Sequence, residues 1–289
     1  MAIRDYLRLT NPPIVGLLVF TAVAGGIIAG GARDPLQLLG IAVAITLSSM
    51  GARALTNYVD RDMDARMERT RDRPLPSGAI PPPRALAYGI ALAALGLVAT
   101  LPLGLVPVGL VAIGLADNVI VYNVLTKRRT YWNIILGAPS GGIPVLVGYV
   151  AVAGRIDLTG ILLASLVVLW TPIHIWSLAI RSREDYARAQ VPMLPVVLGV
   201  RSGIRCIAAT SALLAIFTLA LPFVPGSPFG YATGIGAAGL GAVLIAASAL
   251  LIHRPTLINA WRLFKLTSPY LAVLFLLMAV DAAAARPPW

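Results

Sequence analysis

Residues 37–59 read QLLGIAVAITLSSMGARALTNYV, a stretch in which Arg53 is the only charged side chain. A transmembrane helix needs about 20 consecutive, mostly apolar residues, so this stretch is long enough to cross a bilayer. Eight more stretches qualify, at 13–31, 84–104, 106–125, 132–152, 159–180, 203–222, 230–252 and 267–285. We therefore expect an all-α, polytopic membrane protein of about nine transmembrane helices, with residues 1–289 forming a single domain.

The composition supports a membrane protein and excludes two other readings. Of the 289 residues, 58% are hydrophobic and 12% are charged, about half the charged share of a typical soluble protein. The basic N-terminus precedes an apolar run with no clear cleavage site, which indicates a first transmembrane segment and not a signal peptide. The single cysteine, Cys206, excludes an intrachain disulfide.

The net charge of +11 would suggest a nucleic-acid partner in a soluble protein, but its distribution indicates membrane topology. With nine segments, all 23 Lys and Arg residues except Arg33, Arg155 and Arg286 fall on the side of the N-terminus. Basic residues accumulate on the cytoplasmic side of membrane proteins. We therefore expect a cytoplasmic N-terminus, an odd number of segments and no nucleic-acid partner.

The end of the second segment carries a polar face, within 53-RALTNYVDRDMDARMERTRDRPLPSG-78. If the helix continues, Arg53, Asn57, Asp60 and Asp64 fall at i, i+4, i+7 and i+11 and share one face. Asp60 and Asp64 would then lie about 5–6 Å apart at their Cβ atoms, close enough to share a divalent cation. Carboxylate oxygens suit Mg²⁺, which takes its other ligands from water and substrate phosphates.

Basic residues accompany these carboxylates: Arg69 and Arg73 follow in the same loop, and Lys127 and Arg128 lie in another loop on the same side. Guanidinium groups bind phosphate oxygens in a bidentate fork. The combination indicates a site for a diphosphate with an apolar tail. A juxtamembrane cluster that sets topology and contacts anionic headgroups is the alternative, and the helical alignment of Asn57 with the two carboxylates favours a site.

A second candidate region is 170-WTPIHIWSLAIRSREDYARAQVPMLPVV-197. Asp185 and Tyr186 follow the sixth segment at the expected depth of Asp60 and Asp64. His174 lies inside that segment, where an ionisable side chain is uncommon and often functional. A hydrogen-bonded packing histidine is the alternative.

The sequence resembles the UbiA superfamily of intramembrane prenyltransferases along nearly its whole length. The 60–78 block, with Met67, Arg69, Thr70 and Arg73, is typical of the superfamily. The resemblance continues through 127-KRRT-130 and through Trp170, Pro172 and His174. The Asp185–Tyr186 pair with 191-VPMLPVV-197 is similar to the heme branch, the protoheme IX farnesyltransferases.

The resemblance implies nine helices around a central cavity open to lipid. It also implies that Asp60 and Asp64 hold Mg²⁺ on the diphosphate with help from Asp185, while Arg69, Arg73, Lys127 and Arg128 neutralise the leaving group. The sequence departs from the superfamily at two positions. Thr56 stands where the superfamily has asparagine, so either Thr56 or Asn57 could serve, and Arg181 stands where many members carry another acid.

The implied reaction transfers an isoprenoid from farnesyl or geranylgeranyl diphosphate to a vinyl group of heme b, and water supplies the new hydroxyl. Arg53, Asn57 and Tyr186 would bind substrate, and His174 would contact heme as an axial ligand or hydrogen-bonding partner. The active site would face the cytoplasm from the cell membrane. Two alternatives remain: an aromatic acid or glycerophosphate lipid as the acceptor, or a transporter, which would place charges near the bilayer midplane.

Overall fold

A computed structural model describes residues 3–285; residues 1–2 and 286–289, which include Arg286, lie outside the described part. The described residues form helices and turns without strands. The α-helices are α1 (Ile3–Thr10), α2 (Pro12–Ile28), α3 (Pro35–Asp64), α4 (Pro82–Thr100), α5 (Leu105–Ala116), α6 (Asn133–Gly137), α7 (Pro139–Ala153), α8 (Leu158–Arg181), α9 (Arg183–Arg188), α10 (Leu194–Val197), α11 (Val200–Ala220), α12 (Tyr231–His253) and α13 (Leu257–Ala284). A π-helix, η3 (Asp117–Thr126), extends α5, and three short 3₁₀ turns are η1 (Gly31–Arg33), η2 (Leu101–Leu103) and η4 (Leu221–Phe223).

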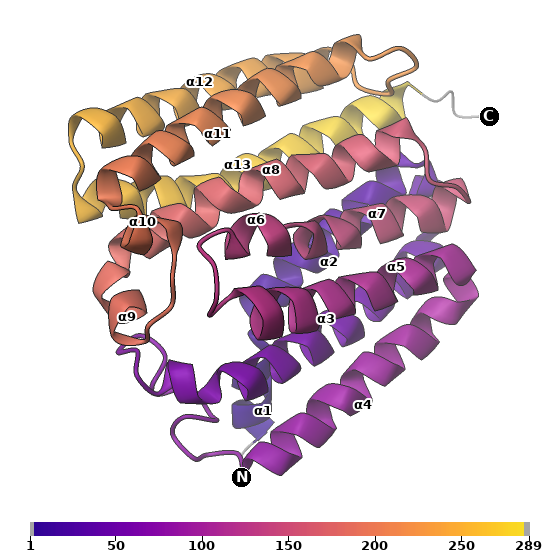
Figure 1. Ribbon diagram of the computed structural model, residues 1–289. Coiled ribbons are helices and arrows are strands. Elements are labelled where there is room, and N and C mark those ends of the chain that lie inside the picture. The colour runs from indigo at the N-terminus through magenta and orange to yellow at the C-terminus, as the bar shows by residue number, and fades with distance from the viewer. Residues whose placement is uncertain (1–2, 286–289) are drawn as a thin grey trace.

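The long helices lie side by side with their axes roughly aligned across the molecule (Figure 1). Within residues 3–285, eight helices are long and apolar enough to cross a membrane. A ninth crossing is formed if α1 and α2, which meet at 53°, count as one bent segment. The expectation of an all-α membrane protein with about nine transmembrane helices is confirmed.

Helix α3 is the element that places the polar face. It begins at Pro35, whose missing N–H costs nothing at the first helical position, and the Asp34 side chain accepts a 2.9 Å hydrogen bond from the N–H of Gln37. At 1.5 Å per residue its 30 residues extend about 45 Å, against roughly 30 Å of hydrocarbon in a bilayer. The last turns, with Asp60 and Asp64, therefore project beyond the apolar layer while keeping helical register.

Close helix packing surrounds this element. A methyl group added at Gly148 of α7 would overlap the carbonyl oxygen of Ala22 on α2, and one added at Gly51 of α3 would overlap the backbone of Ala93 on α4. Without a hydrophobic driving force between helices in lipid, such backbone proximity supplies the van der Waals contact that holds them together. The glycines seen in the apolar stretches thus fix the helix spacing around the site.

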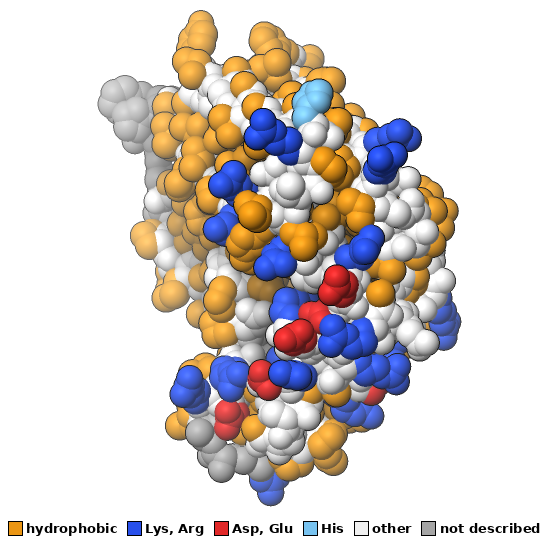
Figure 2. Space-filling view, turned by 90° about the vertical axis from the view of Figure 1, so that its left-hand side faces the viewer, with side chains coloured by type: hydrophobic (Ala, Val, Ile, Leu, Met, Phe, Trp, Pro, Cys, Tyr) orange, Lys and Arg blue, Asp and Glu red, His pale blue; other side chains and the backbone are white. Residues whose placement is uncertain are grey.

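The charged residues gather at one end of the bundle, as the alternating loops predict. Figure 2 views this end, where Lys and Arg side chains are spread over the face and Asp and Glu side chains lie among them. One predicted boundary is wrong: the last helix begins at Leu257 and not at 267, capped by the Thr256 hydroxyl, which accepts from the N–H of Asn259. Arg262 and Lys265 therefore lie on exposed helical turns and not in a loop.

Candidate active site

A small polar pocket of about 80 Å³ lies at the charged end, between α3, the 65–81 turn, η3 and α9. The predicted helical face is confirmed, because Asn57, Asp60 and Asp64 are all buried and line this pocket together. Its lining consists of Arg53, Thr56, Asn57, Asp60, Met63, Asp64, Met67, Arg69, Arg73, Tyr122, Lys127 and Tyr186.

Each carboxylate in the pocket is paired with a cation from outside α3. The Arg73 Nη1 donates to Asp64 Oδ2 at 2.7 Å, and the Lys127 ammonium donates to Asp60 Oδ2. Opposite charges therefore compensate for the burial of two carboxylates one helical turn apart, which would otherwise repel. Asp60 Oδ1 is buried and has no hydrogen-bond partner within the described chain.

Asparagine side chains fix the two cations in place. Asn57 donates to the Leu9 carbonyl at 2.6 Å, and its Oδ1 accepts from Arg73 Nη1 at 3.2 Å. Asn123 of η3 donates to the Asn118 carbonyl at 2.6 Å and accepts from Lys127 Nζ at 3.2 Å. Asn57 thus ties the N-terminal segment to the pocket, and Asn123 performs the corresponding task for the π-helix.

Three further residues expected at the site occupy different places. Tyr186 lines the pocket, where burial raises the pKa of its phenol, against the opposing effect of cations such as Arg69. Asp185 does not line the pocket: its carboxylate oxygens accept from the backbone N–H groups of Glu68 and Arg69 at 3.1 and 3.3 Å. This contact holds the 65–81 turn in position.

Arg128 also lies outside the pocket lining. It forms a bidentate pair with Asp62, both bonds being 2.8 Å, and both side chains are substantially exposed. The hydrogen bonds that Arg128 donates to Asp62 raise the pKa of its guanidinium, which stays charged. Adjacent residues, Lys127 and Arg128, therefore serve the inside and the rim of the same site.

The chemistry of the donors fits a magnesium ion. Residues 3–285 contain no cluster of three His, Cys, Asp or Glu side chains arranged for a metal, so Asp60, Asp64 and Asp185 do not form one. Mg²⁺ commonly uses only one or two carboxylates and completes its shell with water and phosphate oxygens. The unpartnered Asp60 Oδ1 beside Asp64 is the kind of oxygen that such an ion satisfies.

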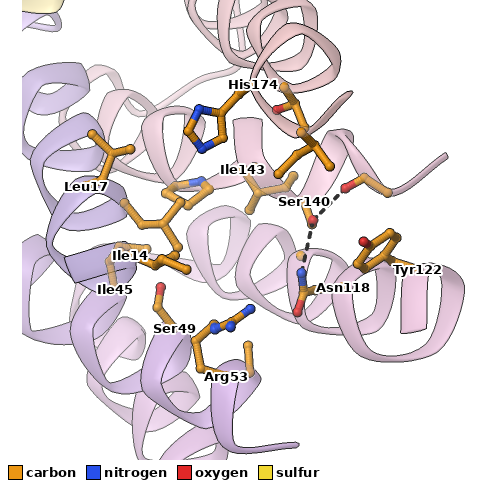
Figure 3. Close-up of a pocket in the computed structure, with 18 of the residues that line it drawn as sticks. Ile14, Leu17, Ile45, Ser49, Arg53, Asn118, Tyr122, Ser140, Ile143 and His174 are labelled. Carbon is orange, nitrogen blue, oxygen red and sulfur yellow. Dashed lines mark hydrogen bonds between the residues drawn. The ribbon is translucent and has the colours of Figure 1, made fainter. Parts of the chain in front are cut away.

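An apolar cavity of about 460 Å³ lies next to the polar pocket, deeper in the bundle. Its wall is mostly Ile, Leu, Val, Pro and Gly from α2, α3, α5, α6 and α7, with Trp170 and His174 from α8 and Phe264 from α13. Arg53 and Tyr122 line both spaces and form the boundary between them. Figure 3 shows Arg53 and His174 on opposite sides of this cavity.

His174 is held so that only one ring edge is free. Its ring is stacked between Trp170 and Phe264, with centroids 4.5 and 4.3 Å away. The Thr267 hydroxyl donates to the Phe264 carbonyl at 2.7 Å, so it must accept from His174 Nδ1, which lies 2.7 Å from it. Nδ1 therefore carries the proton, and Nε2 keeps its lone pair on the edge available to the cavity.

Several residues that build the two spaces were not among the candidates from sequence: Tyr122, Asn123, Asn118, Ser140 and Thr267. A signal existed for Asn118 and Asn123, because amide side chains inside the apolar stretch 106–125 are costly unless they bond. No comparable signal existed for Thr267, whose partner His174 lies 93 residues away.

Comparison with known proteins identifies the family. Residues 17–279 match the UbiA prenyltransferase family. A protoheme IX farnesyltransferase from Desulforudis audaxviator is 46% identical over 282 residues, which cover 96% of this chain and 88% of that protein. The chain belongs to the UbiA prenyltransferase family. A second protoheme IX farnesyltransferase, from Thermoplasma volcanium, is 41% identical over 96% of this UbiA chain and 97% of its own length.

The UbiA fold is also seen in solved structures. A UbiA homolog from Archaeoglobus fulgidus bound to DMAPP and Mg²⁺ superposes with a TM-score of 0.68, at 16% sequence identity, over 93% of this chain and 99% of that one. At this identity the likeness shows the fold alone.

Proposed function

We propose that this UbiA protein transfers a prenyl group, farnesyl or geranylgeranyl, from its diphosphate to a vinyl group of heme b, giving heme O and diphosphate. The observation that carries the proposal is the junction at Arg53 and Tyr122, where a pocket of paired carboxylates and cations meets an apolar cavity containing a histidine edge. A diphosphate with an apolar tail matches the charged pocket and the apolar cavity, and an iron porphyrin matches the histidine edge. The relatives named for the same reaction support it.

Mg²⁺ would be held by Asp60 and Asp64, with Asp185 acting on the turn that carries Arg69; the ion supplies charge neutralisation for the departing diphosphate. Arg73 and Lys127 are paired with these carboxylates, and they would be free to bind the phosphate oxygens if a divalent cation took their place. Arg69 and the neutral Tyr186 phenol add donors from the opposite wall. Preorganised donors of this kind stabilise charge as it develops on the leaving group.

The apolar cavity would receive the prenyl chain and the porphyrin. Because its lining has few polar atoms, the cavity would keep bulk water away from the allylic cation, and the vinyl carbon would be the available nucleophile. The Nε2 lone pair of His174 is oriented as an axial ligand for heme iron, because both ring faces and Nδ1 are already engaged. This tautomer favours the ligand role over a hydrogen bond donated to heme.

The experiment that tests this function uses the purified protein in lipid nanodiscs with heme b, Mg²⁺ and either farnesyl or geranylgeranyl diphosphate. A porphyrin product heavier by one prenyl group and one hydroxyl group is the expected result. Parallel incubations replace heme by an aromatic acid or a glycerophosphate lipid. Prenylation of one of these acceptors, with heme unchanged, would assign the protein to another branch of the family.

We also propose that residues 1–289 form one domain in the cell membrane, with the N-terminus and the active site on the cytoplasmic side. The support is the gathering of Lys and Arg at the end that holds the polar pocket. Single cysteines at Ser77, on this end, and at Pro225, on the other, can be placed in a Cys206→Ser background. In intact cells a membrane-impermeant thiol reagent should label only the cysteine at position 225.

A further inference from the structure

Asn118 is a half-buried polar residue that the pocket chemistry described above does not use. It lies on η3, lines the apolar cavity, and its Oδ1 is buried without a hydrogen-bond partner among residues 3–285. An unsatisfied amide oxygen in such surroundings costs free energy, so a retained one indicates a missing partner. Figure 3 shows Asn118 beside Ser140, which lines the same cavity.

The Asn118–Ser140 pair leaves two oxygen acceptors free. Asn118 Nδ2 donates to Ser140 Oγ at 3.4 Å, and the Ser140 hydroxyl donates to the Gly137 carbonyl at 2.7 Å. The opposite amide orientation would place two acceptors together, so the observed one is favoured. The acceptors that remain are the amide oxygen of Asn118 and a free lone pair on Ser140 Oγ, beside the second N–H of the Asn118 amide.

Of the proposed reactants, only water can satisfy these acceptors inside the cavity. The porphyrin core of heme b, with its nitrogens on iron, has no N–H, and a prenyl chain has no polar hydrogen. The carboxyl groups of heme lie on the opposite side of the macrocycle from its vinyl groups. Water that gives one hydrogen to Asn118 Oδ1 and the other to Ser140 Oγ has two polar partners, enough to hold it in an apolar site.

The position along η3 matches the reacting carbon. Tyr122 marks the boundary with the polar pocket, and Asn118 lies four residues earlier on the same helix, about one turn farther from the charged end. The new carbon–carbon bond forms next to the diphosphate. The second vinyl carbon, which receives the hydroxyl, is one bond farther from the diphosphate, and a vinyl group that points into the cavity would bring it toward Asn118.

We propose that Asn118 and Ser140 position the water that becomes the hydroxyl group of the product, an inference that rests on the proposed function. The prenyl carbon–oxygen bond breaks and diphosphate takes its electron pair. The vinyl π pair forms the bond between the terminal vinyl carbon and prenyl C1, leaving a cation on the carbon attached to the porphyrin. A lone pair of the held water forms the carbon–oxygen bond, and the proton released goes to diphosphate.

Two acceptors suit this task, because they hold the water by its hydrogens and leave its lone pairs for the cation. A cation without such a water loses a neighbouring proton instead and forms an alkene. That product is lighter than the hydroxylated one by one water molecule, so the two are separated by mass. The ratio of alkene to hydroxylated product therefore reports on the water site independently of the overall rate.

The test measures this ratio for the wild type, Asn118→Leu, Ser140→Ala and, as a matched control, Thr171→Val. Thr171 lines the same cavity, but its hydroxyl is satisfied by the Val167 carbonyl at 2.8 Å. We expect the ratio to rise about tenfold or more in the first two variants, the effect of one lost hydrogen bond, and to stay at the wild-type value in the control. Wild-type turnover in ¹⁸O-water should place the label in the hydroxyl.

An unchanged ratio in both Asn118→Leu and Ser140→Ala would overturn the proposal, as would an equal rise in Thr171→Val. If Asn118→Leu loses all turnover, the smaller Ser140→Ala change decides by the same ratio. Wild-type protein that leaves heme unmodified would refute the proposed function itself, and the water assignment with it.

Discussion

The polar pocket and the apolar cavity are neighbours that share Arg53 and Tyr122, yet they differ in every property that governs chemistry. The pocket is about 80 Å³ and is lined by charges in pairs; the cavity is about 460 Å³ and is lined mostly by hydrocarbon. We expect the pocket to bind charge by compensating it and the cavity to keep bulk water away from a reactive cation. Separation of the two functions along one helical bundle explains how ionisation and capture can proceed within a few ångströms.

The division also assigns different consequences to damage in each region. Loss of a charge in the pocket should reduce the rate of ionisation, whereas loss of a polar group in the cavity should change the product or the affinity for heme. Variants on either side of Arg53 and Tyr122 can separate these outcomes.

The largest effect is expected for Asp64→Asn. Removing one carboxylate charge halves the proposed Mg²⁺ ligand set and leaves Arg73 without its ion-pair partner. Turnover of heme b should fall about a thousandfold, comparable to the loss of a major electrostatic contribution in an active site. Steady-state assays at several Mg²⁺ concentrations measure it, with thermal unfolding as the test of folding.

Asp62→Asn is the matched control for this change. Asp62 lies two residues before Asp64 at the end of α3, but it pairs with Arg128 at the exposed rim. Its turnover should remain within roughly twofold of the wild type, the usual scale for surface changes. Equal losses of turnover in the two variants would show that Asp64 has no role in catalysis beyond that of the rim residue Asp62.

Arg53→Met should produce the next largest effect. Arg53 Nε is buried with no hydrogen-bond partner in the described chain, and Arg53 lines the pocket proposed to bind the diphosphate. We expect a roughly hundredfold lower turnover. Because an apolar side chain replaces a cation whose Nε is buried without a hydrogen-bond partner, the unfolding temperature without substrate should rise. A lower unfolding temperature would mean that Arg53 stabilises the fold at the boundary between the polar pocket and the apolar cavity.

The sequence was sufficient for features that depend on local periodicity. Arg53, Asn57, Asp60 and Asp64 share a face because 3.6 residues make a turn, and the chain contains no proline from 36 to 73 to interrupt it. The apolar stretches located the helices for the same reason. At Arg262 and Lys265 an exposed helical extension carries charge, so hydropathy starts the predicted segment at 267, after the helix has begun at Leu257.

Features that depend on long-range contact could not be predicted. Asp185 and Asp64 are both acids next to basic loops, but the oxygens of Asp185 accept backbone N–H groups more than a hundred residues away. The π-helix η3 changes the register of Tyr122, Asn123 and Lys127 relative to an α-helix, so facing residues cannot be assigned by counting. The tautomer of His174 depends on Thr267, which lies on a different helix.

Thr267→Val should have a smaller effect that is confined to the cavity. The change removes the acceptor for His174 Nδ1–H, so the imidazole can adopt the other tautomer and present N–H to the cavity. We expect roughly tenfold weaker heme binding and a shifted Soret band, without a change in KM for the prenyl diphosphate. Ser177→Ala, which removes a buried hydroxyl elsewhere on α8, should alter neither. Equal shifts in both variants would indicate a general packing defect.

The smallest effect is expected for Arg128→Gln, one residue from a cation that lines the pocket. The family resemblance assigns phosphate binding to both Lys127 and Arg128, but only the Lys127 ammonium reaches Asp60, while Arg128 is engaged by Asp62 at the exposed rim. Exposed ion pairs contribute at most about 1 kcal/mol, so turnover and KM for the prenyl diphosphate should change less than about fivefold. An increase in KM as large as that of Lys127→Gln would show that Arg128 leaves Asp62 for the phosphate when substrate binds. The polar pocket would then extend to the rim when substrate binds, through a rearrangement of the loop that carries both cations. The apolar cavity has no such change to make.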